Sequence, residues 1–578
     1  MLKAPVGRRT IIKALATGPW LAGKGAFAAS IGEPMTVFEA RRIVTMERSF
    51  PHARFMAVAD GTVLAVANRM EDLAAWTSGR EVRHDRRFAD KILFPGLIDP
   101  HIHPMQSAVM LGMPFLAPDE WHLPSGHWDS LLSQDAYRAR LARLVAESPA
   151  DPLICWGHHE LFHGPLDRTI LDTIAPDRAL LVWQRSFHEI FANTAALAWM
   201  GLDTPEAFAA AMAAGGADPA QSSFELGMFS ETGLGVALAK LRPVLLSQDK
   251  LASGFAGLKQ VMAERGVTTT SDMATGIFAP FATEAGLIAR AFGAVDARAR
   301  VMLMPIAAAL GSVEDLDAWM NDAAKFVSAN VRLDRRVKLF ADGAFFAQNM
   351  RMGTPGYSDG HIGKWLTEPG ELHHQLERFW KAGFSLHIHV NGDEGADVVL
   401  DGIAALAARG DQTITLEHLG YCTEAQVRRI ARLGLMVSAQ PNYIRVLGDA
   451  YARHGFGPDR AALMNRLGSL ERENVPLGLH SDFNMAPIDP FYLAWIAQTR
   501  MGLDGKARGL DERLGREKAL RAITIEAAQV IGMDDMIGSL AAGKKADFIA
   551  LDADPFEVEV GMLKEMPIAA TVFEGMAI

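Results

Sequence analysis

The amino-acid sequence predicts an α/β fold, in which a (β/α)8 TIM-type barrel carries a small β-sandwich built from both termini and an inserted subdomain after the first barrel strand. Three observations carry this prediction. Short apolar runs alternate with helix-like stretches through the middle of the chain, hairpin-like segments occur near both ends, and one interval between runs is too long for a single crossover. A hydrophobic content of 49% over 578 residues excludes a largely disordered chain.

The first 30 residues differ in composition from the rest of the chain, because all their charged residues are basic. Arg8 and Arg9 precede a moderately apolar stretch, and Ala26-Phe27-Ala28 matches a small-x-small cleavage site. The paired arginines resemble a twin-arginine export signal, and Lys24 makes the apolar part too short to span a membrane. We therefore expect a signal peptide over residues 1–30 and an exported, periplasmic protein. A basic tail on a cytoplasmic protein is the alternative.

Strand-like segments at both ends are expected to form the β-sandwich, over residues 31–94 and 531–578. Near the N-terminus, Asp60-Gly61 has the sequence of a tight hairpin turn. Near the other end, residues 538–551 and 570–573 alternate between apolar and polar in the same way. Neither piece has enough apolar residues for a core of its own, so we expect the two to assemble together.

Eight apolar runs predict the barrel, over residues 95–530. From the second run onward their spacing is near the roughly 30 residues of a βαβ unit. An open doubly wound sheet has the same spacing, so spacing alone leaves both arrangements open. The runs are Gly96–His103, Gly266–Asp272, Arg300–Ile306, Arg336–Phe340, Gly383–His389, Gln412–His418, Leu435–Gln440 and Leu477–Asp482.

The long interval between the first and second runs predicts the inserted subdomain, at about residues 104–250. It contains strand-like segments at Leu153–His159 and Ala179–Arg185, and a helix-like segment at Thr194–Gly201. An insertion after the first strand lies at the C-terminal mouth of a barrel. We therefore expect it to act as a lid over the site.

Polar residues stand on the predicted barrel strands, most of them at the strand ends, where catalytic side chains converge in this fold. In Leu97–His103 the period of two places His101 and His103 on one face of a strand. Nitrogen and oxygen ligands of this kind suit Zn²⁺, with Fe²⁺ or Mn²⁺ as alternatives. The candidate metal ligands are His101, His103, Lys338, His389, His418 and Asp482.

Two of these candidate metal ligands have alternative interpretations. His387 lies on the same strand face as His389, so the ligand on that strand is one of the two. The apolar neighbours of Lys338 imply burial, and a structural pairing with a nearby carboxylate such as Asp342 is the other interpretation of this lysine.

The order of these residues resembles that of the metal-dependent amidohydrolase superfamily, and within it the YtcJ-like or amidohydrolase-3 family. The resemblance covers the chain after the signal, and the motifs that carry it are Phe94–His103, Gly266–Thr270, Lys338–Gly343 and Ile537–Asp547. The Gly392-Asp393 pair resembles the family pattern that follows the histidine ligand and favours His389 over His387.

The resemblance implies a role for each candidate. His101, His103 and Asp482 would hold one ion, and His389 and His418 would hold a second, with a carbamylated Lys338 between the two. Asp482 would also transfer protons during catalysis.

The implied activity is metal-dependent hydrolysis of carbon–nitrogen bonds in non-peptide amides, N-formyl and cyclic amides included. A bound metal lowers the pKa of a water molecule to about 7, and the resulting hydroxide attacks the substrate carbon. A heterocycle deaminase and an ester or lactone hydrolase would use the same site and stay open as alternatives. A non-catalytic binding or regulatory protein with the same fold is the alternative from another class.

The insertion adds one candidate substrate-binding residue. His188 begins a motif, ending at Asn193, that resembles a His-to-Asn pattern of the family between a strand and a helix. The alternative interpretation is a helix N-cap preceded by a loop histidine.

Charge and cysteine content restrict the partners. The net charge of −11 argues against a general nucleic-acid binder, and two cysteines cannot form a disulfide framework. We expect a small-molecule substrate and no stable membrane span in the mature chain. Self-association into a homo-oligomer is compatible with the sequence, but no repeat or heptad pattern identifies an interface.

Overall fold

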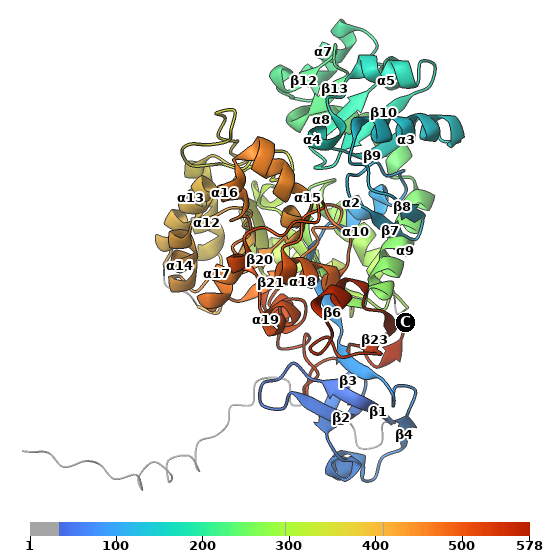
Figure 1. Ribbon diagram of the computed structural model, residues 1–578, viewed down its shortest axis with the longest axis vertical. Helices are drawn as coiled ribbons and strands as arrows, with labels where there is room; N and C mark the ends of the chain where they lie inside the picture. The colour runs from blue at the N-terminus through green and yellow to red at the C-terminus, as the bar shows by residue number, and fades with distance from the viewer. Residues whose placement is uncertain (1–33, 295, 408–409) are drawn as a thin grey trace, which may run out of the picture.

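The computed structural model describes residues 34–294, 296–407 and 410–578 (Figure 1). The predicted signal peptide, residues 1–30, lies outside the described residues. The chain forms three parts along its long axis: a sheet at one end, a central body built on two parallel sheets, and the inserted subdomain at the opposite end. In the part of the chain that the structure describes, every helix is too short or too polar to span a bilayer.

Both termini contribute to one mixed sheet with the order β24-β23-β22-β5-β1-β2-β3, and β4 pairs with β1. Both ends share one hydrogen-bonded path, because β5 joins β1 on one side to β22 on the other, and a bridge between Thr62 and Lys545 brings the β3 edge to the segment before β22. Phe38 and Phe548 pack edge to face at 5.1 Å in its core. The strands are β1 (Met35–Val44), β2 (His52–Ala59), β3 (Thr62–Ala67), β4 (Val82–Asp85), β5 (Ile92–Pro95), β22 (Phe548–Leu551), β23 (Ile568–Phe573) and β24 (Met576–Ala577).

Two parallel sheets form the central body and contain all eight predicted runs. Their orders are β16-β15-β14-β6 and β17-β18-β19-β20-β21. The ninth strand, β16 (Val331–Leu333), pairs with the edge of β15 and was not predicted. The others are β6 (Leu97–Ile102), β14 (Val267–Thr275), β15 (Arg300–Pro305), β17 (Arg336–Phe340), β18 (Ser385–Val390), β19 (Ile414–His418), β20 (Met436–Ala439) and β21 (Leu477–Leu479).

Hydrogen bonds among the described residues do not close these two sheets into one continuous barrel. Single parallel bridges join them, Ile102 with Phe483 on one side and Ile306 with Lys338 on the other. Pairing stops early on the first side because β21 is only three residues long and Asp482 adopts a left-handed φ of 54°. The predicted strands follow one another in chain order within the two sheets. Hydrogen bonds among the described residues do not close these sheets into a continuous barrel.

Helices cover the outside of the two sheets. In α12 the buried residues Leu372, Leu376, Phe379 and Trp380 repeat at helical spacing on one face. The helices of the body are α2 (Pro104–Met110), α9 (Gln248–Glu264), α10 (Phe281–Phe292), α11 (Leu316–Ala323), α12 (Pro369–Lys381), α13 (Asp393–Ala404), α14 (Glu424–Arg432), α15 (Asn442–Ala450), α16 (Pro458–Ala461), α17 (Leu467–Arg472), α18 (Pro490–Thr499), α19 (Arg516–Arg521) and α20 (Ile525–Val530).

The inserted subdomain has a five-stranded sheet of its own, with the order β12-β13-β11-β10-β9 (Figure 1). A short hairpin, β7 (Trp121–Leu123) and β8 (Gly126–Trp128), connects it to the body. Its other elements are β9 (Leu153–His158), β10 (Leu180–Gln184), β11 (Glu189–Ala192), β12 (Ser222–Ser223), β13 (Met228–Ser230), α3 (Gln134–Glu147), α4 (Glu160–His163), α5 (Arg168–Ile174), α6 (Thr194–Met200), α7 (Pro205–Ala214) and α8 (Leu234–Leu245).

Candidate metal centre

The carboxyl ends of β6 and β21 bring three predicted ligands together. The Nε2 atoms of His101 and His103 lie 3.4 Å and 3.0 Å from Oδ1 of Asp482. The left-handed backbone of Asp482 turns the chain at this point, just after β21 ends. One ligand atom from each of the three residues falls within 4.8 Å of the others. The group expected to hold one ion is therefore assembled in the structure.

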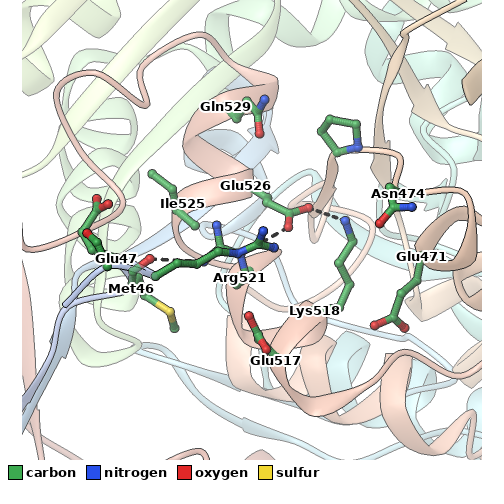
Figure 2. Close-up of a pocket in the computed structure, with 13 residues that line it drawn as sticks. Met46, Glu47, Glu471, Asn474, Glu517, Lys518, Arg521, Ile525, Glu526 and Gln529 are labelled. Carbon is green, nitrogen blue, oxygen red and sulfur yellow. Dashed lines mark hydrogen bonds and ion pairs between the residues drawn. The ribbon is translucent and has the colours of Figure 1, made fainter. Parts of the chain in front are cut away.

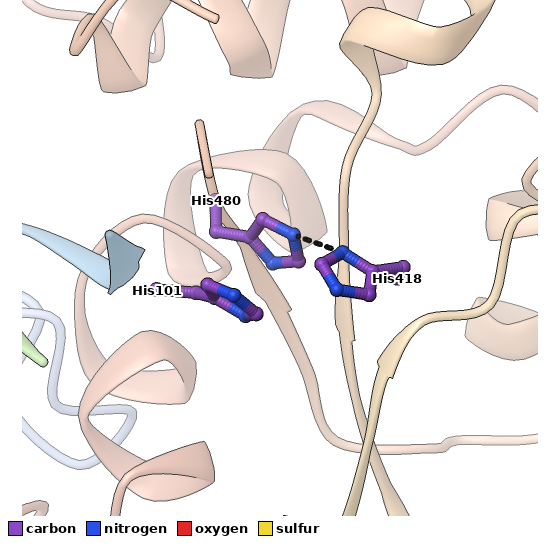
Figure 3. A group of neighbouring side chains, drawn as sticks. All are labelled: His101, His418 and His480. Carbon is purple, nitrogen blue, oxygen red and sulfur yellow. Dashed lines mark hydrogen bonds between the residues drawn. The ribbon is translucent and has the colours of Figure 1, made fainter. Parts of the chain in front are cut away.

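A second convergent group contains His101, His418 and His480 (Figure 3). His418 ends β19, and its Nδ1 lies 3.1 Å from Nε2 of His480. Ser438 holds the other nitrogen of His480, with 2.8 Å between Oγ and Nδ1. Sequence analysis did not single out His480. The signal available was its position two residues before Asp482, which the period-two rule places on the same strand face.

β18 places His389 beside the centre and leaves His387 engaged elsewhere. The ring centroids of His389 and His418 are 4.6 Å apart, although His389 belongs to neither convergent group. Both ring nitrogens of His387 have partners, Glu417 at 2.7 Å and Arg336 at 3.3 Å. The choice of His389 as the ligand on this strand stays a prediction.

Glu417, which sequence analysis missed, orients two histidines. Its two carboxylate oxygens accept hydrogen bonds of 2.7 Å from Nδ1 of His101 and 2.7 Å from Nδ1 of His387. With Nδ1 donating, the Nε2 lone pair of His101 is free to bind a metal ion, which is how carboxylates commonly orient metal-binding histidines. The signal in the sequence was an acidic residue directly before the candidate ligand His418 in a predicted strand.

Lys338 is buried at the centre of β17. Its Nζ has no hydrogen-bond partner among the described residues. Burial lowers its pKa to about 8, although the charges of Glu417 and Asp482 oppose the shift. Asp342 accepts hydrogen bonds from three backbone N–H groups instead of from the lysine. The structural pairing of Lys338 with Asp342 that the sequence allowed is therefore wrong.

The histidines of the centre are held in the neutral form. Burial is the main cause that lowers their pKa values well below the usual range, and nearby positive charge adds to it. Neutral imidazole is the form that binds metal ions. This applies to His101, His389, His418 and His480.

These observations fit a divalent metal ion. Asp482 Oδ1 is a buried atom without a hydrogen-bond partner in the described part of the chain. An unpaired buried polar group costs roughly 1–3 kcal/mol. A cation held between neutral imidazoles and a carboxylate offsets part of that cost and uses the donor set that Zn²⁺ prefers.

His188 of the insertion lies near this centre. Its Nδ1 is 3.0 Å from Oε2 of Glu231. Its charge adds to the lowering of the pKa of His389, for which burial is the main cause. The N-cap of the alternative interpretation is also present, because the Asn193 side chain caps α6.

The insertion is fastened to the loop that follows Asp482. Arg185 is fully buried, pairs with Asp119 and donates a 2.8 Å hydrogen bond to the carbonyl of Met485. Its guanidinium lies over the rings of Trp121, Trp156 and Phe346 at 5.8, 5.6 and 4.9 Å.

A cavity of about 730 Å³ lies away from this centre, among the segment after β1, the residues before β21, and α19 and α20 (Figure 2). Two of its cations are already paired, because Glu526 contacts Lys518 at 2.6 Å and Arg521 at 3.5 Å. No candidate ligand is among its lining residues. We therefore assign the chemistry to the strand-end centre and not to this cavity.

Comparison with protein families identifies one match over most of the chain. A model described as an amidohydrolase family matches residues 89–578. A structure of an uncharacterized metal-dependent hydrolase from Pyrococcus horikoshii OT3 superimposes with a TM-score of 0.67 at 21% identity, covering 91% of this chain and 99% of that chain. At this identity the likeness supports the fold.

Three curated relatives are similar in sequence. Protein LONG AFTER FAR-RED 3 of Arabidopsis thaliana is 24% identical, over 89% of this chain and 86% of its own length. The YtcJ protein of Bacillus subtilis is 23% identical, over 84% of this chain and 89% of its own length. An N-substituted formamide deformylase of Arthrobacter pascens is 28% identical over 242 residues, which is 42% of this chain and 44% of that relative. The match to the deformylase thus spans less than half of its length.

Proposed function

The chain belongs to the amidohydrolase family, and on that premise we propose that it is a metal-dependent hydrolase of carbon–nitrogen bonds in non-peptide amides. The observation that carries the proposal is the convergence of His101, His103 and Asp482 at the carboxyl ends of two strands. The formamide deformylase among its relatives supports N-formyl amides as the narrower substrate class. Cyclic amides are the next class to test.

We assign the ligands as the family resemblance implies. His101, His103 and Asp482 would hold one ion, and His389 and His418 would hold a second, with a carbamylated Lys338 as a further ligand. The burial of Lys338 and the absence of a partner for its Nζ in the described chain support this role. Zn²⁺ is the proposed metal, since neutral imidazole and carboxylate ligands suit it. A divalent ion at this place polarises a water molecule and the substrate carbonyl.

Asp482 carries the proton transfer. Its Oδ1 lies between His101 and His103, while Oδ2 is 3.9 Å from Nδ1 of His418. With 10% of the side chain exposed, Oδ2 is the oxygen that takes the proton from water and passes it to the leaving nitrogen. Glu417 holds the ring of His101 in the orientation that this step needs. His188 of the insertion is the proposed contact for the substrate carbonyl.

Buried amide groups support an uncharged polar substrate. Asn442 follows β20 and Asn484 follows β21, and neither amide has a hydrogen-bond partner among the described residues. Each amide offers one donor group and one acceptor, which suits a neutral amide more than a charged ligand. We assign Asn442 and Asn484 to recognition of the non-reacting part of the substrate.

Export by the twin-arginine route to the periplasm is proposed from the sequence of residues 1–30. Changing Arg8 and Arg9 to lysine together should retain the protein in the cytoplasm, as measured by fractionation of cells that express the full chain. Unchanged periplasmic localisation of that variant would contradict this route.

Metal analysis combined with an amide panel tests the proposed activity. Wild-type protein is expected to carry about two transition-metal ions per chain and to hydrolyse members of a panel of formamides, lactams and hydantoins. Asp482→Asn should lower kcat by at least roughly 100-fold, and the His101→Ala/His103→Ala double variant should lose metal and activity together. Hydrolysis and metal content that both persist in the double variant would falsify the proposal.

A further inference from the structure

A second group of metal-binding side chains lies on the β7–β8 hairpin. Glu120 precedes β7, His122 and His127 face each other in the strand register, and Asp129 follows β8. We propose that this hairpin binds one divalent transition-metal ion, such as Zn²⁺, at a site separate from the candidate metal centre. The proposal uses none of the residues that carry the proposed hydrolysis.

The ligand atoms of the hairpin converge on one point. His122 Nε2 lies 2.9 Å from Oε1 of Glu120, and His127 Nε2 lies 3.4 Å from the same oxygen. One ligand atom from each of these three residues falls within 4.8 Å of the others. Asp129 lies beside this group of three, with Oδ1 at 3.1 Å from His127 Nε2. Two imidazoles and one carboxylate suit Zn²⁺ or Cu²⁺, with water completing the coordination.

The fold holds the two histidines on the outer face of the hairpin. Successive side chains of a strand point to opposite faces. Trp121 is fully buried, and Trp128 stacks on Phe115 with 5.8 Å between centroids. Fixing these two tryptophans inward therefore turns His122 and His127 outward, where a metal ion from solvent can reach them.

The carboxylate beside the site is also oriented. Arg140 on α3 contacts Oδ2 of Asp129 at 3.0 Å, which leaves Oδ1 directed at His127. The side chains of Glu120, His122 and His127 are at least 45% exposed, so binding requires little desolvation and no rearrangement of the core.

An ion at this place would brace the connection between the insertion and the candidate metal centre. On the buried face, Trp121 contacts Phe483 with 5.9 Å between centroids, and Phe483 follows Asp482 directly. The same tryptophan lies under the Arg185 guanidinium. Stiffening the hairpin from outside thus restricts a segment that touches the loop of the centre.

Zinc titration of the holoenzyme tests the site. Isothermal titration with Zn²⁺ should detect one further equivalent per chain, and His122→Ala/His127→Ala should remove that equivalent while the metal already present stays bound. The matched control is His361→Ala/His374→Ala, which removes two exposed histidines that also lie near carboxylates. The control should keep the additional equivalent. Equal zinc uptake by the wild-type protein and the hairpin variant would overturn the proposal.

Spectroscopy gives a readout that does not depend on stability. Cu²⁺ added to the holoenzyme should give an electron paramagnetic resonance signal with hyperfine splitting from two imidazole nitrogens, and His122→Ala should reduce this to one. Glu120→Gln, which leaves both histidines in place, should weaken the apparent Kd at least tenfold. A spectrum unchanged by either substitution would assign the copper to another place on the chain and refute the site. Because these measurements involve no substrate, they stand apart from the outcome of the hydrolysis tests.

Discussion

Glu417 is the residue on which the geometry of the centre most directly depends. One buried carboxylate accepts hydrogen bonds from His101 on β6 and His387 on β18, so it links strands from both parallel sheets. Its effect on a metal ion is indirect, because it sets the ring orientation and tautomer of His101. It is therefore a positioning residue.

Glu417→Gln is expected to weaken metal binding about 10- to 100-fold, because the amide cannot accept hydrogen bonds from both histidines. Competition with a chromophoric chelator measures this change. The matched control is Glu512→Gln, another buried glutamate, which bonds Ser469 and Arg466 instead of a candidate ligand. The assignment of Glu417 fails if both variants hold metal with the affinity of the wild-type protein.

Asn484→Leu should raise stability and lower activity at the same time. Removing a buried amide that has no partner in the described chain should increase the free energy of unfolding by about 1 kcal/mol. Losing one hydrogen bond to the substrate should reduce kcat/KM roughly tenfold.

Thermal unfolding and steady-state kinetics on the same preparations test this pair of effects. The control is Asn193→Leu, because Asn193 is a buried asparagine that is fully paired and caps α6. That variant should be less stable than the wild-type protein. A destabilised Asn484→Leu protein would show that the Asn484 amide has partners in the free enzyme.

At the scale of elements, the sequence predicts features that depend on a single strand or helix. The apolar runs located eight strands of the two parallel sheets, and the period of two placed together His101 and His103, which converge in the structure. The sequence does not predict contacts between elements that are far apart in the chain. Glu417 and His480 join the centre through contacts between strands, and a local pattern carries no record of such contacts.

Arg185 of the insertion makes contacts whose loss should measurably lower the free energy of unfolding. Arg185→Met leaves Asp119 buried without its partner, which is expected to lower the free energy of unfolding by roughly 3–5 kcal/mol. Adding Asp119→Leu should recover most of this loss, because the uncompensated charge is then gone. Denaturant titration of the single and double variants measures both effects.

Arg168→Met provides the comparison for Arg185→Met. Arg168 contacts Glu225, whose side chain is 77% exposed, so its removal should cost less than about 1 kcal/mol. If Arg185→Met were equally mild, the buried Arg185–Asp119 pair within the insertion and the Arg185 hydrogen bond to Met485 would contribute little to stability.

At the scale of the whole molecule, the two chain ends depend on each other. β5 lies between β1 and β22, so the N-terminal and C-terminal strands complete one sheet. Sequence analysis predicted that neither end forms a core alone, and the shared packing of Phe38, Phe548 and Val572 agrees with this. It could not predict the order of the strands in this sheet, because that order depends on which strand edges pair.

Val572→Asp should disrupt this sheet and lower the yield of soluble protein, because a carboxylate then replaces a fully buried side chain. The expected loss is at least roughly 3 kcal/mol. Ala569→Asp, at an exposed position of the same strand, should behave as the wild-type protein. Size-exclusion chromatography and thermal unfolding compare the two variants, and equal behaviour would contradict the shared core.

Because single bridges join the two parallel sheets in the described chain, we expect less resistance to pulling between the sheets than within either sheet. Between β6 and β21 the described backbone is joined at Ile102 and Phe483, and Asp99 reaches across to Ser481. His101 and His103 lie on the β6 side of this junction, and Asp482 lies on the β21 side. An ion bound by all three would therefore cross-link the two sheets and resist a force that pulls them apart. Pulled across this junction in an optical trap, the protein should rupture at lower force after chelation, while the terminal sheet keeps its resistance to stretching.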